Sequence, residues 1–244
     1  DPKEDVVKHG THVAGIIAAE RNNDMGINGV ASNAKIMAIR AVPDGDEYDK
    51  DIAYAIRYAV DNGAKVINTS FGKYYSTHPE WVIEAIQYAA MNDVLIVNAA
   101  GNEGIDLDEK RVYPNDQTPE DATEVADNFI NIGAIGPNIG ETLVAGFSNY
   151  GKTNLDIFAP GASIYSTVPN DEYEFLQGTS MAAPAVAGIA AMVRSYYPDL
   201  TATQVKQVIM KSGIVYENEV VLGGDPDNKE SLPKVSVTGK FANL

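Results

Sequence analysis

Apolar residues follow two patterns along the chain: short unbroken runs, and longer stretches with apolar residues three and four positions apart. Unbroken runs predict buried parallel strands, and the wider spacing predicts helices that cover them. This alternation predicts an α/β fold with three αβα layers and a mostly parallel sheet. The predicted strands are 34–42, 64–70, 94–101, 128–135, 155–161 and 162–168, and the predicted helices are 9–20, 49–63, 79–93, 201–213 and a helix beginning at Ser180.

No internal repeat and no linker divides the 244 residues, so we expect a single domain over residues 1–244. In parallel sheets, functional groups gather on the loops beyond the carboxyl ends of the strands. Two such loops stand out here, 70–79 and the long acidic segment 102–128. These loops are the predicted location of the functional site.

Composition narrows the classes of partner and chemistry. A net charge of −16 argues against nucleic acid and anionic membrane surfaces, because both need basic patches. The chain has no cysteine, which excludes disulfides and thiolate catalysis. No apolar run reaches the roughly 18 residues of a membrane span, and the first residues show no signal peptide.

Ser180 stands at the start of the apolar segment 181–193, which also contains Pro184. A serine in this position either caps a helix or is a nucleophile presented at the amino end of the helix. The lipase pattern Gly-x-Ser-x-Gly is not satisfied, because Ala182 takes the final position. We expect Pro184 to be tolerated because first-turn amides have no intrahelical acceptor or only just gain one.

Four further segments separate the two interpretations. The stretches "HGTHVAGIIAA" (9–19) and "GTSMAAPAVAGIAA" (178–191) closely resemble the histidine and serine signatures of the subtilisin-like serine proteases, the subtilases. Between them, "AAGNEG" (99–104) and "INTSFG" (67–72) resemble the oxyanion and substrate-binding segments of that family, and "FSNYG" and "DIFAPG" match its pattern as well. The resemblance extends from His9 to about Gly213 and implies a serine endopeptidase.

The resemblance also implies the role of each catalytic residue. Ser180 would be the nucleophile, His9 the general base, and Asn102 the side-chain donor to the oxyanion. His12 would then be structural. The rival interpretation, a metal bound by both histidines, lacks the His-Glu-x-x-His pattern.

Two short segments resemble the backbone edges that hold an extended peptide substrate as an added strand. They are Ser70-Phe71-Gly72 and Ala99-Ala100-Gly101. Glu103 follows the oxyanion asparagine. It lies either at the rim of the pocket for the residue before the cleaved bond, where it would admit polar or basic side chains, or on the solvated surface.

A calcium site is a further implication of the resemblance. Residues 21–29 resemble the calcium loop of the family, with Asn23 and the carbonyls of Arg21, Met25 and Ile27 as candidate ligands. Calcium prefers six to eight oxygens. The other ligands of the family precede the histidine motif, so this candidate set is incomplete.

The family's triad aspartate precedes its histidine by some tens of residues, at the end of a central strand. Only eight residues precede His9, and neither Asp1 nor Asp5 follows a strand-like sequence. We therefore expect a protease domain truncated at both ends, lacking one or more N-terminal strands. Two hypotheses follow: an endopeptidase, or an impaired fragment that acts as a peptide-binding module. Open sheet edges predict self-association, and family analogy predicts an extracellular or periplasmic protein.

Overall fold

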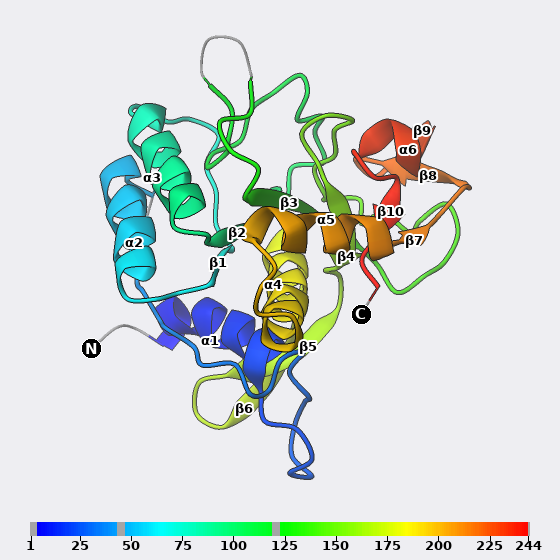
Figure 1. Cartoon of the computed structure of the whole chain (residues 1–244). Helices are drawn as coiled ribbons and strands as arrows, with labels where there is room; N and C mark the ends of the chain where they lie inside the picture. Colours follow the sequence, from blue (N-terminus) through cyan, green and yellow to red (C-terminus); the bar gives the residue numbers. More distant parts are fainter. Residues whose placement is uncertain (1–3, 43–46, 119–122, 244) are drawn as a thin grey trace.

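The computed structural model describes residues 4–42, 47–118 and 123–243. A six-stranded sheet forms the centre of the molecule (Figure 1). Its strands pair in parallel except at the β10–β7 pair, which confirms the predicted mostly parallel sheet. In spatial order they are β1 (Val66–Thr69), β2 (Leu95–Ala99), β3 (Phe129–Ile135), β4 (Ile157–Pro160), β10 (Lys240–Phe241) and β7 (Ile214–Val215).

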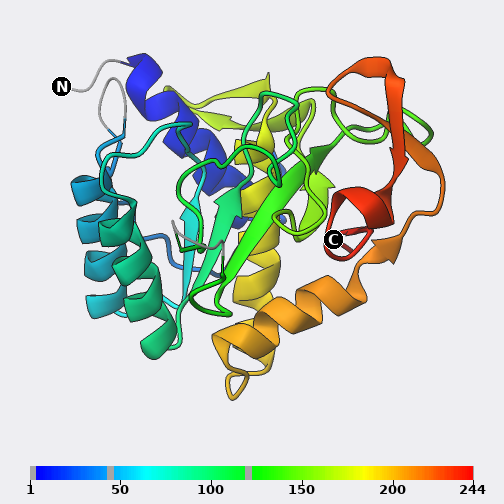
Figure 2. The same cartoon turned by 90° about the horizontal axis from the view of Figure 1, so that it is seen from above.

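Helices cover both faces of this sheet, so the three-layer prediction is also confirmed (Figure 2). The pair α2 (Asp49–Asp61) and α3 (Pro79–Met91) covers one face, and α4 (Thr179–Tyr196) and α5 (Ala202–Ser212) cover the other. Strand β2 shows why: side chains alternate along a strand, so Leu95 and Val97 pack toward α4 and α5 while Ile96 packs toward α2 and α3.

The amino-terminal helix α1 (Glu4–Ala18) lies outside the sheet, against α4 and a separate hairpin. That hairpin consists of β5 (Ile164–Val168) and β6 (Glu172–Leu176). Near the carboxyl end, β8 (Glu219–Leu222), β9 (Asp225–Ser231) and the short helix α6 (Leu232–Val235) form a second peripheral unit. In the part of the chain that the structure describes, none of the helices is both long and apolar enough to cross a bilayer.

The structure corrects two predicted strands. Residues 34–42 run without strand pairing, and Ile36 and Met37 are 47% and 41% exposed. An apolar run forms a strand only where a neighbour completes its ladder, and no described residue does so here. The predicted strand 162–168 exists, but as β5 of the hairpin and not in the main sheet.

One helix begins where a signal in the sequence places it, and another begins earlier than predicted. Helix α5 begins after Thr201, whose side chain accepts the amide of Gln204 while the Gln204 side chain accepts the amide of Thr201. That capping box is readable in the sequence. Helix α1 begins at Glu4, five residues before the predicted start at His9.

The edge strand β1 bears on self-association. Its residues Val66 to Asn68 are only half-buried, and its outer side has no paired strand among the described residues. An open edge of this kind can pair with another strand. Self-association stays a prediction.

Candidate active site

Ser180 occupies the second position of α4, which begins after Gly178. Gly178 has a φ of 148°, a conformation that favours glycine, and it lets the chain turn from β6 into the helix. Met181 is buried against α1, whereas Ser180 is half-buried at the helix end. The amino end of a helix carries free N–H groups and a positive partial charge, which suits a developing oxyanion.

The reason that α4 tolerates Pro184 differs from the one expected. Pro184 lies in the second turn, where a residue would normally donate to the carbonyl of Ser180 four positions earlier. Proline has no N–H, so that carbonyl is left for another donor. The hydroxyl of Ser70 donates to it at 2.8 Å.

A second hydrogen bond joins the same two residues, with Ser180 now the donor. Ser180 Oγ donates to the carbonyl of Ser70 at 3.1 Å. Of the hydrogen bonds formed by the described residues, none joins Ser180 to His9. In this conformation the Ser180 hydroxyl is therefore held by the residue that follows β1, and not by His9, its predicted base.

The packing of α1 against α4 nevertheless places His9 on the side of α1 that faces the helix carrying Ser180. Val13 and Ile16 of α1 pack against Met181 and Ala185 of α4. His9 precedes Val13 by one turn, so it lies on the side of α1 that faces the start of α4. Catalytic hydrogen bonds are often longer or absent without substrate. The role of His9 as base stays a prediction.

The surroundings of the two histidines differ. Desolvation lowers the pKa of His9, and nearby His12 lowers it further. His9 is exposed, so solvent screening limits the effect of His12. His12 is fully buried, and its Nε2 lies 3.1 Å from the carbonyl oxygens of Ile164 and Glu174. These bonds tie α1 to the β5–β6 hairpin and support the structural role of His12.

Asn102 lies just beyond β2, beside the start of α4. Its Oδ1 accepts the backbone N–H of Thr179 at 2.8 Å and the hydroxyl of Thr179 at 3.0 Å. The same hydroxyl accepts the N–H of Gly101 at 3.0 Å. Because Oδ1 is engaged on the Thr179 side, Nδ2 remains to donate, and a β-carbon built on Gly178 would lie 3.4 Å from it.

The two predicted substrate edges leave the sheet together. Strands β1 and β2 are parallel, with Thr69 opposite Asn98, so Ser70–Gly72 and Ala99–Gly101 continue from the same edge. Beyond the first of them, Lys73 and Tyr113 exchange backbone hydrogen bonds of 2.9 and 2.8 Å. Phe71 is half-buried and packs against the core between the sheet and the α2–α3 pair, and Glu103 is exposed.

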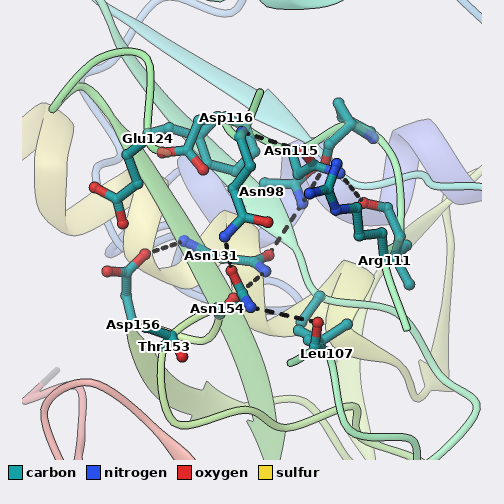
Figure 3. Close-up of a pocket in the computed structure, with 15 residues that line it drawn as sticks. Asn98, Leu107, Arg111, Asn115, Asp116, Glu124, Asn131, Thr153, Asn154 and Asp156 are labelled. Carbon is teal, nitrogen blue, oxygen red and sulfur yellow. Dashed lines mark hydrogen bonds between the residues drawn. The ribbon is translucent and has the colours of Figure 1, made fainter. Parts of the chain in front are cut away.

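A polar pocket lies behind the second edge (Figure 3). Asn98 is buried there, accepts the hydroxyl of Thr69 at 2.7 Å and donates to Asn131 at 3.0 Å, so its role is structural. Burial, and secondarily Glu124, raise the pKa of Asp116 to about 7. The other residues that line the pocket are Ala100, Leu107, Arg111, Val112, Pro114, Asn115, Gln117, Phe129, Thr153, Asn154 and Asp156.

The predicted calcium ligands form an exposed loop after α1. Asn23 Oδ1 accepts the N–H of Met25 at 3.1 Å, and residues 21–26 are exposed. This set offers one side-chain oxygen, already engaged, and the carbonyls of Arg21, Met25 and Ile27. Calcium takes six to eight oxygens, so these residues alone do not fit the ion.

No carboxylate is hydrogen-bonded to His9 among the described residues. Asp1 lies outside them, and the structure describes no side chain at Asp5. Two residues that support the site were not predicted, Thr179 and Asn149. Both lie within segments that resemble the family, which was the only signal for them, and their contacts follow from the tertiary structure.

Comparisons with known proteins identify the family of the chain. The model of the subtilase family matches residues 1–233. The thermophilic serine proteinase of Bacillus sp. (strain AK1) is 43% identical over 192 residues, which are 78% of this chain and 43% of that protein. Subtilisin DY of Bacillus licheniformis is 38% identical over 200 residues, 81% of this chain and 67% of that protein.

Solved structures give the same answer. Sphericase superposes with a TM-score of 0.79 at 30% identity, covering 97% of this chain and 77% of that one. The S41 psychrophilic protease gives a TM-score of 0.78 at 29% identity, with the same coverage. The chain thus spans less than half of the first relative and about three quarters of these structures. It belongs to the subtilase family.

Proposed function

We propose that this chain is a serine endopeptidase whose nucleophile is Ser180. The observation that carries the proposal is the arrangement at the start of α4. Asn102 is fixed through its Oδ1 by Thr179, so its Nδ2 is left to donate beside the nucleophile. Preorganised donors at a developing oxyanion are usually the largest single contribution to such catalysis.

The reaction is acyl transfer in two halves. Ser180 Oγ attacks the carbonyl carbon of the peptide bond while His9 takes its proton, and the carbonyl oxygen becomes an oxyanion that Asn102 Nδ2 stabilises. Collapse breaks the C–N bond, and the imidazolium of His9 gives its proton to the leaving amine. Water then attacks the acyl-enzyme with His9 again as base, which releases the acid and restores Ser180.

The substrate in this proposal is a polypeptide bound in extended form between Ser70–Gly72 and Ala99–Gly101. Support comes from the parallel pairing of β1 with β2, which leads both segments out of the same edge of the sheet. We further propose an extracellular or periplasmic location, by analogy with the family.

The second candidate is an impaired, peptide-binding form of the same site. It is favoured by the Ser180 hydroxyl, which donates to Ser70 and not to His9, and by the lack of a described carboxylate on His9. Loss of that orienting carboxylate costs about 10⁴-fold in turnover when aspartate becomes asparagine in a serine protease triad. The two candidates therefore differ in whether Ser180 is activated.

Covalent labelling by a fluorophosphonate decides between them. Activated Ser180 Oγ attacks phosphorus and expels fluoride, so we expect stoichiometric labelling that Ser180→Ala abolishes. Ser212→Ala, at the far end of α5, is the matched control and should label normally. A folded sample that stays unlabelled would contradict the endopeptidase and favour the peptide-binding form.

A further inference from the structure

Asn149 lies in the loop between β3 and β4, directly behind the Ala99–Gly101 edge, and is fully buried. Its backbone N–H donates to the carbonyl of Gly101 at 3.1 Å. Its side-chain Nδ2 donates to the carbonyl of Ala100 at 2.9 Å. One residue therefore holds two successive carbonyls of the segment that leads into Asn102.

The same side chain holds the segment that follows Asn102. Asn149 Oδ1 accepts the N–H of Glu103 at 3.0 Å and the N–H of Ile105 at 3.1 Å. Asn102 is thus flanked on both sides by peptide groups bound to one buried amide. We call this set of hydrogen bonds from Asn149 to Ala100, Gly101, Glu103 and Ile105 the clamp. It needs an acceptor atom and a separate donor atom on one short side chain, which asparagine supplies and an ionised aspartate, with no donor, does not.

The loop is built closely around this amide. Gly101 has a φ of 101°, in the region that favours glycine. A β-carbon there would lie 2.4 Å from Asn149 Nδ2. The absence of a side chain at Gly101 is therefore what allows the Asn149 amide to approach the chain.

Asn149 is itself anchored to the sheet. Ser148 Oγ donates to the carbonyl of Asn149 at 2.9 Å and accepts the N–H of Ala134 in β3 at 2.9 Å. Ser148 is fully buried as well. The position of the clamp is therefore set by a central strand of the sheet.

We propose that Asn149 is the positioning residue of the oxyanion site: it touches no substrate, and it fixes the turn that aims the Asn102 amide. This inference rests on the proposed function for its kinetic consequence. Its structural part stands separately, because the hydrogen bonds to Glu103 and Ile105 do not depend on activity.

The kinetic test is a double-mutant cycle with peptide hydrolysis as the readout. We expect Asn149→Ala to lower kcat about 10- to 100-fold, the scale that a displacement of about 1 Å produces, with KM nearly unchanged. In an Asn102→Ala background the same substitution should cost under about 3-fold, because the donor that it positions is gone. An equal loss in both backgrounds would overturn the proposal.

Amide hydrogen exchange supplies a readout that needs no activity. Asn149→Ala should accelerate exchange at Glu103 and Ile105, whereas Asn149→Asp, which keeps an acceptor oxygen, should leave these two amides protected. The control is Asn128→Ala, which removes a buried asparagine that donates to Val94 at the opposite end of β2. It should destabilise the fold while leaving kcat and both amides unchanged.

With these measurements, failure of the clamp can be distinguished from failure of the proposed function. If the unsubstituted chain neither labels nor hydrolyses peptide, the endopeptidase fails, and the exchange rates alone decide the clamp. Unchanged exchange of Glu103 and Ile105 in Asn149→Ala overturns it.

Discussion

The two sides of the candidate active site are built differently. On the oxyanion side, Asn102 is tied to Thr179, and its neighbours are tied to Asn149, all at 2.8–3.1 Å. On the base side, His9 is exposed on α1 and makes no described hydrogen bond to Ser180. Hydrogen bonds hold the Asn102 side of the site, whereas among the described residues none joins His9 to Ser180.

The difference follows from what each side is attached to. Asn102 lies three residues beyond β2, a fully buried strand, and its neighbours are held by Asn149, whose loop is bonded to β3. Helix α1 contacts α4 and the β5–β6 hairpin, and its hydrogen bonds to the hairpin run through His12, Ser166 and Thr167. Donors aimed at the oxyanion can be fixed in advance, whereas a base must gain and lose a proton at each step.

The largest expected effect lies on the base side. His9→Ala should lower kcat by about 10²–10⁴-fold, the usual contribution of a positioned general base. Peptide hydrolysis measures it, with His78→Ala as control because His78 is exposed at the start of α3. A loss smaller than about 10-fold would mean that His9 is not the base, which would break the comparison.

A smaller effect is expected from the oxyanion side. Thr179→Val removes the hydroxyl that accepts from Gly101 and donates to Asn102, but keeps the backbone N–H on Asn102 Oδ1. Losing two such hydrogen bonds of about 1 kcal/mol each predicts a decrease in kcat of about 30-fold. Thr69→Val is the matched control, a buried threonine that donates to Asn98. Equal losses in both variants would show that Thr179 acts only through stability.

The smallest expected effect is a shift in the pH dependence of activity, which reports on the surroundings of His9. The base must be neutral, so activity is lost as the pH falls through the pKa of His9. Desolvation and His12 place that pKa below 6.5, so we expect the acid limb of kcat/KM to have its midpoint below 6.5. A midpoint above 6.5 would indicate an orienting carboxylate beside His9, because a negative charge raises the pKa of a histidine.

Much of the fold and site could be predicted from the sequence, because the signals are local or carried by motifs. Apolar runs identified β2, β3 and β4, and the capping box identified the start of α5. The segments around His9, Asn102 and Ser180 pointed to the family that the comparisons show. Their catalytic roles stay predictions.

What the amino-acid sequence by itself determined is therefore the fold class, the family and the candidate chemical groups. The tertiary structure decided how those groups are held. Residues 34–42 are apolar enough for a strand but have no paired neighbour among the residues that the structure describes. The carbonyl that Pro184 leaves without a donor is satisfied by Ser70, and the Asn102 turn is held by Asn149. Each of these outcomes depends on a hydrogen-bond partner distant in the chain, which no local pattern of residues specifies.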